Sequence, residues 1–199
     1  MRIAVAMSGG LDSTVVAALL RAEGHDVIGV SMAVWRNSLC CSFEDVSRAK
    51  EVCHMLGIKH YLIDLLEEFK AQIVSHYVSD RLQGLTPNPC PTCNSDFKLG
   101  LMWDKLLART HADMLATGHY CQILMDFDQR YRLARATDLS RDQAYMLWTL
   151  SQEQLARTLF PLGHYLKSEV RVLAQDLGVK VLTPGRESHG KTSGSTPPS

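Results

Sequence analysis

The sequence has no excess of charge of either sign, because 21 Lys and Arg residues balance 21 Asp and Glu residues. The chain therefore projects no global positive field toward a nucleic acid or a membrane surface, so any polyanion must be held by local groups. It also lacks an apolar run long enough to cross a membrane, and it begins without a basic leader. These absences predict a cytoplasmic protein without a membrane partner.

Cysteines are few, and they do not follow the pattern of a secreted disulfide framework. There are six, with Cys40 beside Cys41 and with Cys90 and Cys93 in a Cys-x-x-Cys pair. This arrangement favours thiols that do chemistry or bind metal. Cys40 and Cys41 are open candidates for a sulfur or cluster role, whereas the remaining two, Cys53 and Cys121, are predicted to fill the core. The histidines show no metal-ligand spacing, and the sequence has no internal repeat.

Alternating apolar runs and helical stretches predict an α/β fold with a doubly wound parallel sheet. The chain has 199 residues and is 46% hydrophobic, which suits one large domain. Continuous apolar runs of the kind found in strands buried on both faces alternate with amphipathic helices that end at glycines. The expected strands cover 2–6, 27–32, 60–63 and 113–116, and the expected helices cover 14–21, 43–56, 67–82 and 96–110.

The later part of the chain is less regular. Three prolines within 86–94 predict a stiff loop rather than a helix or a central strand. A hairpin is expected over 122–134, and two or three helices over 143–158 and 168–177. Residues 183–199 have the composition of a disordered tail. Because ligands of such sheets bind beyond the carboxyl ends of the strands, the turns at Gly9, Met32 and Gly118 should converge on one crevice.

The glycine-rich turn after the first strand predicts an anion site. It lies between a buried strand and a helix N-terminus, where unpaired N–H groups and the helix dipole favour phosphate. Gly9 and Gly10 permit close backbone approach, and Ser8 and Ser13 offer hydroxyl donors. Asp12 could cap the helix or hold a metal ion. The lysine of the common γ-phosphate-transferring P-loop is absent. The alternative is an ordinary glycine turn with a capping side chain.

This turn, Ser8-Gly9-Gly10-Leu11-Asp12-Ser13, is similar to the PP-loop of the N-type ATP pyrophosphatases, which split ATP into AMP and pyrophosphate. Ordered segments further along the chain, up to about residue 178, resemble the tRNA-specific 2-thiouridylases. These segments are Gly29-Val30-Ser31-Met32, Thr86-Pro87-Asn88-Pro89, Cys93-Asn94, Ala116-Thr117-Gly118-His119-Tyr120, Arg141-Asp142-Gln143, Leu150-Ser151-Gln152-Glu153-Gln154-Leu155 and Phe160-Pro161-Leu162-Gly163.

The resemblance implies a fold, a reaction and partners. It implies a Rossmann-like PP-loop ATP pyrophosphatase domain over 1–140, a small helical extension over 141–182 and a tail over 183–199. It also implies ATP-dependent 2-thiolation of the wobble uridine of tRNA, by adenylation of the C2 oxygen and sulfur transfer through a cysteine. The partners would be tRNA, ATP with Mg²⁺, and either a sulfur-donor protein or small-molecule sulfide.

The resemblance also assigns roles to residues. Cys93 matches the nucleophilic cysteine, and a thiol on a rigid loop beside a helix N-terminus is drawn toward thiolate; a buried, inert Cys93 is the alternative. Asp12 would meet Mg²⁺ through ATP. The residues implied to bind ATP are Ala6, Met7, Ser8, Gly9, Gly10, Leu11, Asp12, Ser13, Met32 and Gly118. The residues implied to contact the target base or tRNA are Asn88, Pro89, Cys90, Arg141, Asp142 and Gln143.

The chain departs from the family pattern in two places. Cys90 stands where the family usually has Asp, so that Cys90 and Cys93 could form a redox couple, half of a zinc site, or two ligands of an iron-sulfur cluster. After 185–188 the sequence loses the segment that carries the family's second cysteine, and no cysteine follows Cys121. The family's central and barrel domains are also missing from the match.

Several alternatives stay open on the sequence alone. One is another PP-loop enzyme that adenylates a small molecule, and another is a nucleotide-binding chain without thiolation activity. His119 either contacts a phosphate or orients its turn. Trp35, Trp103 and Trp148 are interpreted as core or interface residues rather than base-stacking platforms.

Overall fold

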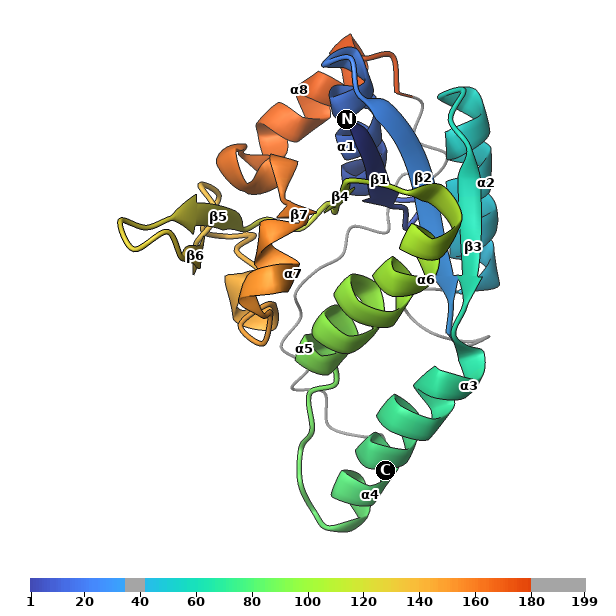
Figure 1. Ribbon diagram of the computed structural model, residues 1–199, viewed down its shortest axis with the longest axis vertical. Coiled ribbons are helices and arrows are strands. Elements are labelled where there is room, and N and C mark those ends of the chain that lie inside the picture. Colours follow the sequence, from blue (N-terminus) through green and yellow to red (C-terminus); the bar gives the residue numbers. More distant parts are fainter. Residues whose placement is uncertain (35–41, 180–199) are drawn as a thin grey trace, which may run out of the picture.

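A five-stranded, fully parallel sheet forms the centre of the computed structural model, which describes residues 1–34 and 42–179 (Figure 1). The strand order β3-β2-β1-β4-β7 places the first strand in the middle, with later strands added on both sides. The predicted doubly wound fold is therefore confirmed. The strands are β1 (Arg2–Ala6), β2 (Asp26–Ala33), β3 (His60–Asp64), β4 (Met114–Ala116) and β7 (Thr158–Leu159).

Helices α1 (Leu11–Ala22), α2 (Phe43–Met55) and α8 (Lys167–Asp176) share one hydrophobic core with the sheet. Ile3 and Val5 of β1 point to this side, where they meet residues such as Val15, and the alternate residue Ala4 belongs to the opposite core. This alternation is the two-residue period of a strand buried on both faces.

The opposite face is covered by one helical run: α5 (Cys90–Thr92), the π-helical segment η2 (Cys93–Leu101) and α6 (Met102–Thr110). The prediction that 90–94 belongs to a loop is wrong, because the helix begins at Cys90. Pro91 lies in the first helical turn, where a missing N–H costs nothing. The Cys90 N–H is bound instead by Asn88 Oδ1 at 3.0 Å.

A second helical run extends away from the sheet (Figure 1). It consists of α3 (Leu66–Phe69), the π-helical segment η1 (Lys70–Val74) and α4 (Ser75–Leu82). It confirms the helix expected over 67–82. Within residues 66–82, all of them described, only Ile73 is buried, so the run contributes little to the core.

The chain beyond β4 returns to the sheet. The expected hairpin is formed by β5 (Gln122–Met125) and β6 (Tyr131–Ala134), and the predicted helices follow as η3 (Ala144–Met146), α7 (Gln152–Ala156) and α8. The short helix η4 (Pro161–His164) was not predicted. The short strand β7, between α7 and η4, was not predicted; it pairs with Leu115 and Ala116 of β4. No helix among the described residues has the length and apolarity to span a membrane. The division of the chain at residues 140 and 182 stays a prediction.

Candidate nucleotide and thiol site

The turn between β1 and α1 depends on a glycine with positive φ and on hydrogen bonds between two serines. Gly9 has φ +71°, and a Cβ there would lie 2.8 Å from Arg48 Cβ and 2.9 Å from Asp45 O, so α2 leaves no room for a side chain. The Ser8 N–H donates to Ser13 Oγ at 3.2 Å, and the two hydroxyl oxygens also lie 3.2 Å apart. The backbone is thus shaped before any ligand arrives.

Asp12 does not cap α1. The capping residue is Gly10, without a side-chain bond, and Asp12 Oδ1 instead accepts from Lys167 Nζ at 2.6 Å and from the Tyr120 hydroxyl at 3.0 Å. Lys167 is 6% exposed and Tyr120 is 3% exposed. Burial, together with the neighbouring Asp12 carboxylate, holds the pKa of Tyr120 well above its usual range. The capping alternative is therefore wrong, and Asp12 belongs to a buried charge pair.

Lys167 is the residue of this site that the sequence reasoning missed. It enters from the first turn of α8, 155 residues after Asp12, so neither motif nor spacing links the two. Its backbone N–H is also fixed, by Asp138 Oδ2 at 3.0 Å. A lysine that opens an amphipathic helix is ordinarily solvated, which is why its sequence position gives no signal.

Gly118 and Met32 lie at the same end of the sheet. A Cβ on Gly118 would lie 3.0 Å from Ser13 N and 3.1 Å from Asp12 Cβ, so the turn after β4 packs directly on α1. Within β2, the Val30 carbonyl accepts from Met7 N–H on the β1 side. Backbone groups alternate sides along a parallel strand, so Met32 faces the β1 side too, beyond the point where β1 ends. Contact between the Gly118 turn and the start of α1 is thus shown, whereas the crevice shared with Met32 and the ATP contacts of these residues stay predictions.

His119 is a neutral, hydrogen-bonded residue. Its Nδ1 lies 2.7 Å from Thr117 Oγ1, and its ring meets the Phe160 ring edge to face at 6.0 Å between centroids. Burial, aided by the charge of Lys98, lowers the pKa of His119 to about 3. These contacts support the alternative in which His119 orients its turn.

The two predicted reactive cysteines begin the helical run on the other face of the sheet. Cys90 is exposed and Cys93 is half-buried against the core. The Cys93 N–H donates to Pro89 O at 2.9 Å, and residues three apart on a helix share a face. Cys53 and Cys121 are buried as predicted, and burial raises the pKa of each to about 12. Cys40, Cys41 and Trp35 lie outside the described residues.

A chain of hydrogen bonds links the phosphate turn to the cysteine helix. The Tyr120 N–H donates to Gln143 Oε1 at 3.0 Å, and the Gln143 N–H donates to Tyr120 O at 2.8 Å. Three residues later, Met146 O accepts from Asn94 Nδ2 at 3.2 Å. Because Tyr120 also binds Asp12, these contacts join the two predicted sites at one end of the molecule.

Two side chains of the predicted tRNA-contacting segment 141–143 form hydrogen bonds within the protein. Asp142 Oδ1 accepts from the Ala136 N–H at 2.9 Å, and the Gln143 side chain binds Tyr120. The Asn88 side chain accepts from the N–H of Cys90, the first residue of the cysteine helix. The contacts of these residues with tRNA remain predictions, as do those of Pro89, Cys90 and Arg141.

Metal ligands are sparse in the part of the chain that the structure describes. There, no group of three or more His, Cys, Asp or Glu side chains could hold a metal ion. Asp12 Oδ1 is already bound by Lys167 and Tyr120. A protein-built magnesium, zinc or cluster site therefore does not fit the described residues, and Mg²⁺ would enter with ATP.

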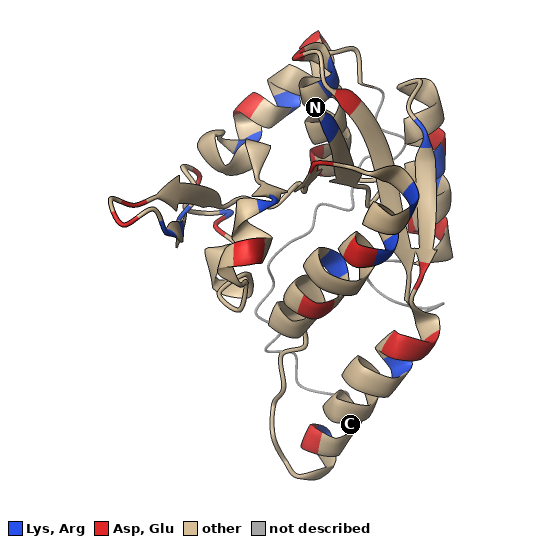
Figure 2. Ribbon diagram, in the orientation of Figure 1, with Lys and Arg blue, Asp and Glu red and all other residues tan. Residues whose placement is uncertain are grey.

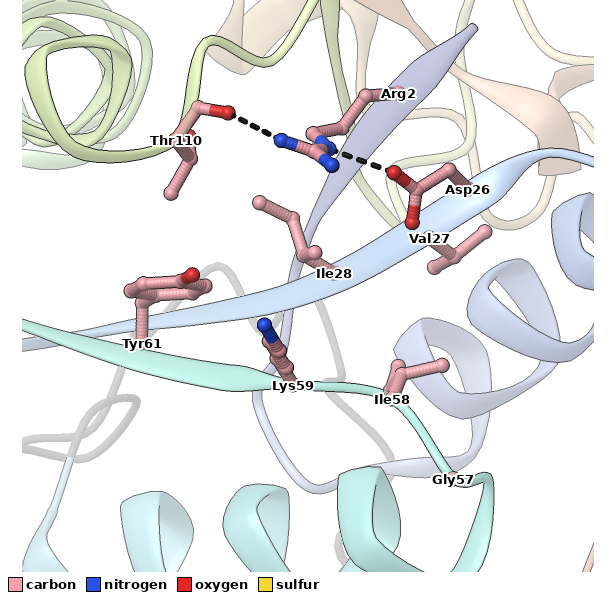
Figure 3. A pocket seen from close by; sticks show the side chains of 9 residues that line it. All are labelled: Arg2, Asp26, Val27, Ile28, Gly57, Ile58, Lys59, Tyr61 and Thr110. Atoms are coloured by element: carbon pink, nitrogen blue, oxygen red, sulfur yellow. Dashed lines mark hydrogen bonds and ion pairs between the residues drawn. The ribbon is translucent and has the colours of Figure 1, made fainter.

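A cavity of about 240 Å³ lies at the opposite, amino-terminal end of the strands (Figure 3). Its Arg2 guanidinium is already bound by Asp26 Oδ2 at 2.7 Å and Thr110 O at 2.8 Å, so this group joins β1 to β2 and to the end of α6. Figure 2 shows basic and acidic residues interspersed over the elements, in keeping with the zero net charge. Neither feature competes with the carboxyl end of the sheet as the candidate site.

Comparisons with known proteins identify the family and the fold of this chain. The family model described as the tRNA methyl transferase HUP domain matches residues 1–191. The tRNA-specific 2-thiouridylase MnmA of Geotalea uraniireducens (strain Rf4) is 46% identical over 195 residues, which cover 92% of this chain and 52% of that protein. The chain thus spans about half the length of the curated relatives it matches.

Solved structures show the same fold at low identity. The predicted subunit of tRNA methyltransferase from Methanocaldococcus jannaschii has a TM-score of 0.56 at 20% identity, covering 88% of this chain and 74% of that one. The U34-tRNA thiolase NcsA from Methanococcus maripaludis, solved with its 4Fe–4S cluster, has a TM-score of 0.54 at 19% identity, covering 95% and 60%. At such identities the likeness establishes the Rossmann-like fold alone.

Proposed function

The chain belongs to the tRNA methyl transferase HUP domain family, and from that membership we propose that it is an ATP-dependent tRNA sulfurtransferase that 2-thiolates the wobble uridine. The support is twofold. Relatives named tRNA-specific 2-thiouridylase match over most of the chain, and the PP-loop turn has the glycine and serine geometry of an anion site.

The proposed reaction has three balanced steps. The C2 oxygen of the uridine attacks the α-phosphorus of ATP, and pyrophosphate leaves. The Cys93 thiolate then adds to C2 and AMP leaves with the former C2 oxygen, after which hydrosulfide adds to C2 and displaces the Cys93 thiolate, so that 2-thiouridine is formed. Backbone N–H groups at the start of α1 and the Lys167 ammonium are the charges available to the departing pyrophosphate.

The single observation that carries this proposal is the bonded path from Asp12 through Tyr120 and Gln143 to the segment that binds Asn94. Adenylation takes place on the C2 oxygen and sulfur transfer on C2 itself, so the phosphate turn and the nucleophile must be held in fixed relation. A nucleotide-binding chain without a second reaction would need no such path. Cys93, next to Asn94, is the residue we assign as nucleophile.

Pyrophosphate release tests the proposal. The chain is incubated with ATP, Mg²⁺, sulfide and either unmodified bulk tRNA or no tRNA, and pyrophosphate and 2-thiouridine are measured on the same samples. We expect both products only with tRNA, and we expect neither from Asp12→Ala, because the variant removes the carboxylate that positions Lys167 and Tyr120 at the phosphate turn. Glu153→Ala, on an exposed residue, is the matched control.

Two results would contradict the proposal. Pyrophosphate release that ignores tRNA but follows a small molecule would favour the rival adenylating enzyme. ATP binding without any pyrophosphate release would favour the rival nucleotide-binding chain.

A further inference from the structure

The segment from Gln143 to Leu150 has three distinct faces. The N–H groups of Met146, Leu147 and Leu150 each donate to the carbonyl three residues earlier, at 3.0, 3.0 and 3.1 Å. Turns of this type repeat every three residues, so side chains three apart lie above one another. The segment therefore presents its side chains in three rows.

Two of the rows are accounted for. Leu147 and Leu150 are buried in the core. The second row is held to the cysteine helix: the Met146 backbone oxygen accepts from Asn94 Nδ2, and the Thr149 hydroxyl donates to Pro91 O at 3.4 Å. Pro91 lies between Cys90 and Cys93, so this segment is fixed beside the proposed nucleophile.

The third row consists of two exposed aromatic side chains. Tyr145 is 54% exposed and Trp148 is 71% exposed. Of the two locations expected for Trp148, core or interface, its exposure excludes the core, whereas Trp103, at 5% exposed, is buried. Large aromatic rings usually bury most of their surface. Two exposed aromatic rings next to a candidate active site indicate a surface that binds a ligand.

We propose that Tyr145 and Trp148 stack on unpaired bases of an RNA loop, namely those beside the target uridine. The inference rests on the proposed function and names the part of the substrate that this surface would take. Proteins read RNA loops by stacking splayed bases on aromatic rings. Residues 143–150 contain no acidic side chain to repel phosphates, and a cation stands next to them, since Lys98 Nζ binds Asn94 Oδ1 at 3.0 Å.

The hairpin provides a matched exposed aromatic residue that lacks these features. Phe127 is fully exposed, but it is a single ring between two aspartates that are ion-paired with Arg132. If exposure alone governed base stacking, Phe127 would behave like Trp148. Because Phe127 has no second aromatic ring three residues away to continue a stack, we expect that it does not, even where Arg130 of the same hairpin contacts a phosphate.

The test measures binding of a labelled RNA hairpin with an unpaired anticodon-type loop, and of a blunt duplex of equal length, by fluorescence anisotropy. We expect Trp148→Ala and Tyr145→Ala each to weaken hairpin binding by about fivefold to a hundredfold. Trp148→Phe should retain most of the affinity, because a ring remains. Phe127→Ala should stay within about twofold of the parent chain, and all variants should bind a fluorescent ATP analogue equally.

Equal hairpin affinity of Trp148→Ala and the parent chain would overturn the inference, even if pyrophosphate release with tRNA upheld the proposed function. A parent chain that does not bind the hairpin at all would overturn both. Self-association that Trp148→Ala abolishes, with RNA binding unchanged, would assign the aromatic pair to a protein contact and overturn the inference as well.

Discussion

At the scale of single residues, the charge pair beneath the phosphate turn decides how the site is held. Lys167 Nζ and Asp12 Oδ1 are 2.6 Å apart, and the side chains are only 7% and 18% exposed. Removing one member of such a pair leaves a charge with little water around it. The pair therefore stabilises the fold only when both Lys167 and Asp12 are present.

We therefore expect Lys167→Met to lower the free energy of unfolding by about 3 kcal/mol. Adding Asp12→Asn should restore part of the loss, because the uncompensated carboxylate is gone. Urea unfolding of both single variants and the double variant measures the coupling. The control is Lys105→Met, which breaks the exposed Lys105–Glu68 pair and should cost less than about 1 kcal/mol. Strictly additive single effects would contradict the coupling.

His119 makes a second residue-scale prediction, on pH. Its pKa is about 3 in the folded state, against about 6.5 when unfolded, and the groups facing it are the Thr117 hydroxyl, the Phe160 ring and the Lys98 ammonium. Between these values the unfolded state binds more protons. The stabilisation from neutral His119 is therefore complete above about pH 6.5 and is lost as pH falls toward 3.

The expected slope from this residue is about 1.4 kcal/mol per pH unit near pH 5. His119→Gln, which does not titrate, should lose less stability than the parent chain between pH 7 and pH 5 in denaturant titrations. His60, whose pKa burial also lowers, is present in both chains and cancels in the comparison. If the free energies of unfolding of the two chains fell equally with pH, the pKa of His119 would be the same in the folded and unfolded states, which would contradict the prediction.

At the scale of elements, the sequence predicted the strands and helices that a short run of consecutive residues identifies. Strands buried on both faces are continuous apolar runs, and the helices end at Gly24, Gly57 and Gly84, which all take positive φ. Strand β7 was missed because two residues are too few to show a period. The start of α5 was missed because the prolines that predict a loop are also tolerated in a first helical turn.

Cys90 and Cys93 lie three residues apart on one helical run, so their thiols can act either together or separately. If Cys90 and Cys93 act as one unit, passing a persulfide between them or holding a metal or cluster with Cys40 or Cys41 as third ligand, Cys90→Ser and Cys93→Ser should fail alike in thiolation. If Cys93 is the sole nucleophile, Cys93→Ser should stop thiolation, whereas Cys90→Asp should keep it, because the resembling family has Asp there. Nucleoside analysis for 2-thiouridine distinguishes the two.

Adenylation is the internal control for these variants. The phosphate turn lies in a different loop from the cysteine helix, so pyrophosphate release with tRNA should survive every cysteine substitution. Cys53→Ser adds a background control, since that buried thiol takes no part. A Cys93→Ser protein that still thiolates tRNA would contradict both versions of the prediction.

At the scale of the whole molecule, what sequence could not supply is contact between distant segments. Lys167 meets Asp12 across 155 residues, and Tyr120 meets Gln143 across 23, through bonds that no local pattern encodes. The glycine turn was predictable because its chemistry lies within six consecutive residues. The candidate site was therefore foreseen as a set of separate motifs, and the contacts that unite them were not.

Zero net charge leads to the last prediction, on how tRNA is bound. Without a global positive field, phosphate contacts depend on a few local cations, for which we expect Lys98, Arg130, Arg135 and Arg141 to serve. Four such contacts to single-stranded RNA give a slope of log affinity against log salt of about −3, so affinity should fall about fiftyfold between 50 and 200 mM salt. Filter binding over that range measures the slope, and Arg135→Gln should reduce the magnitude of the slope by about 0.7.

Lys59→Gln is the control for this prediction: Lys59 lies at the cavity on the opposite end of the sheet, so its substitution should leave the slope unchanged. Tight binding that persists in high salt would contradict the prediction, because it would require contacts that these cations do not provide.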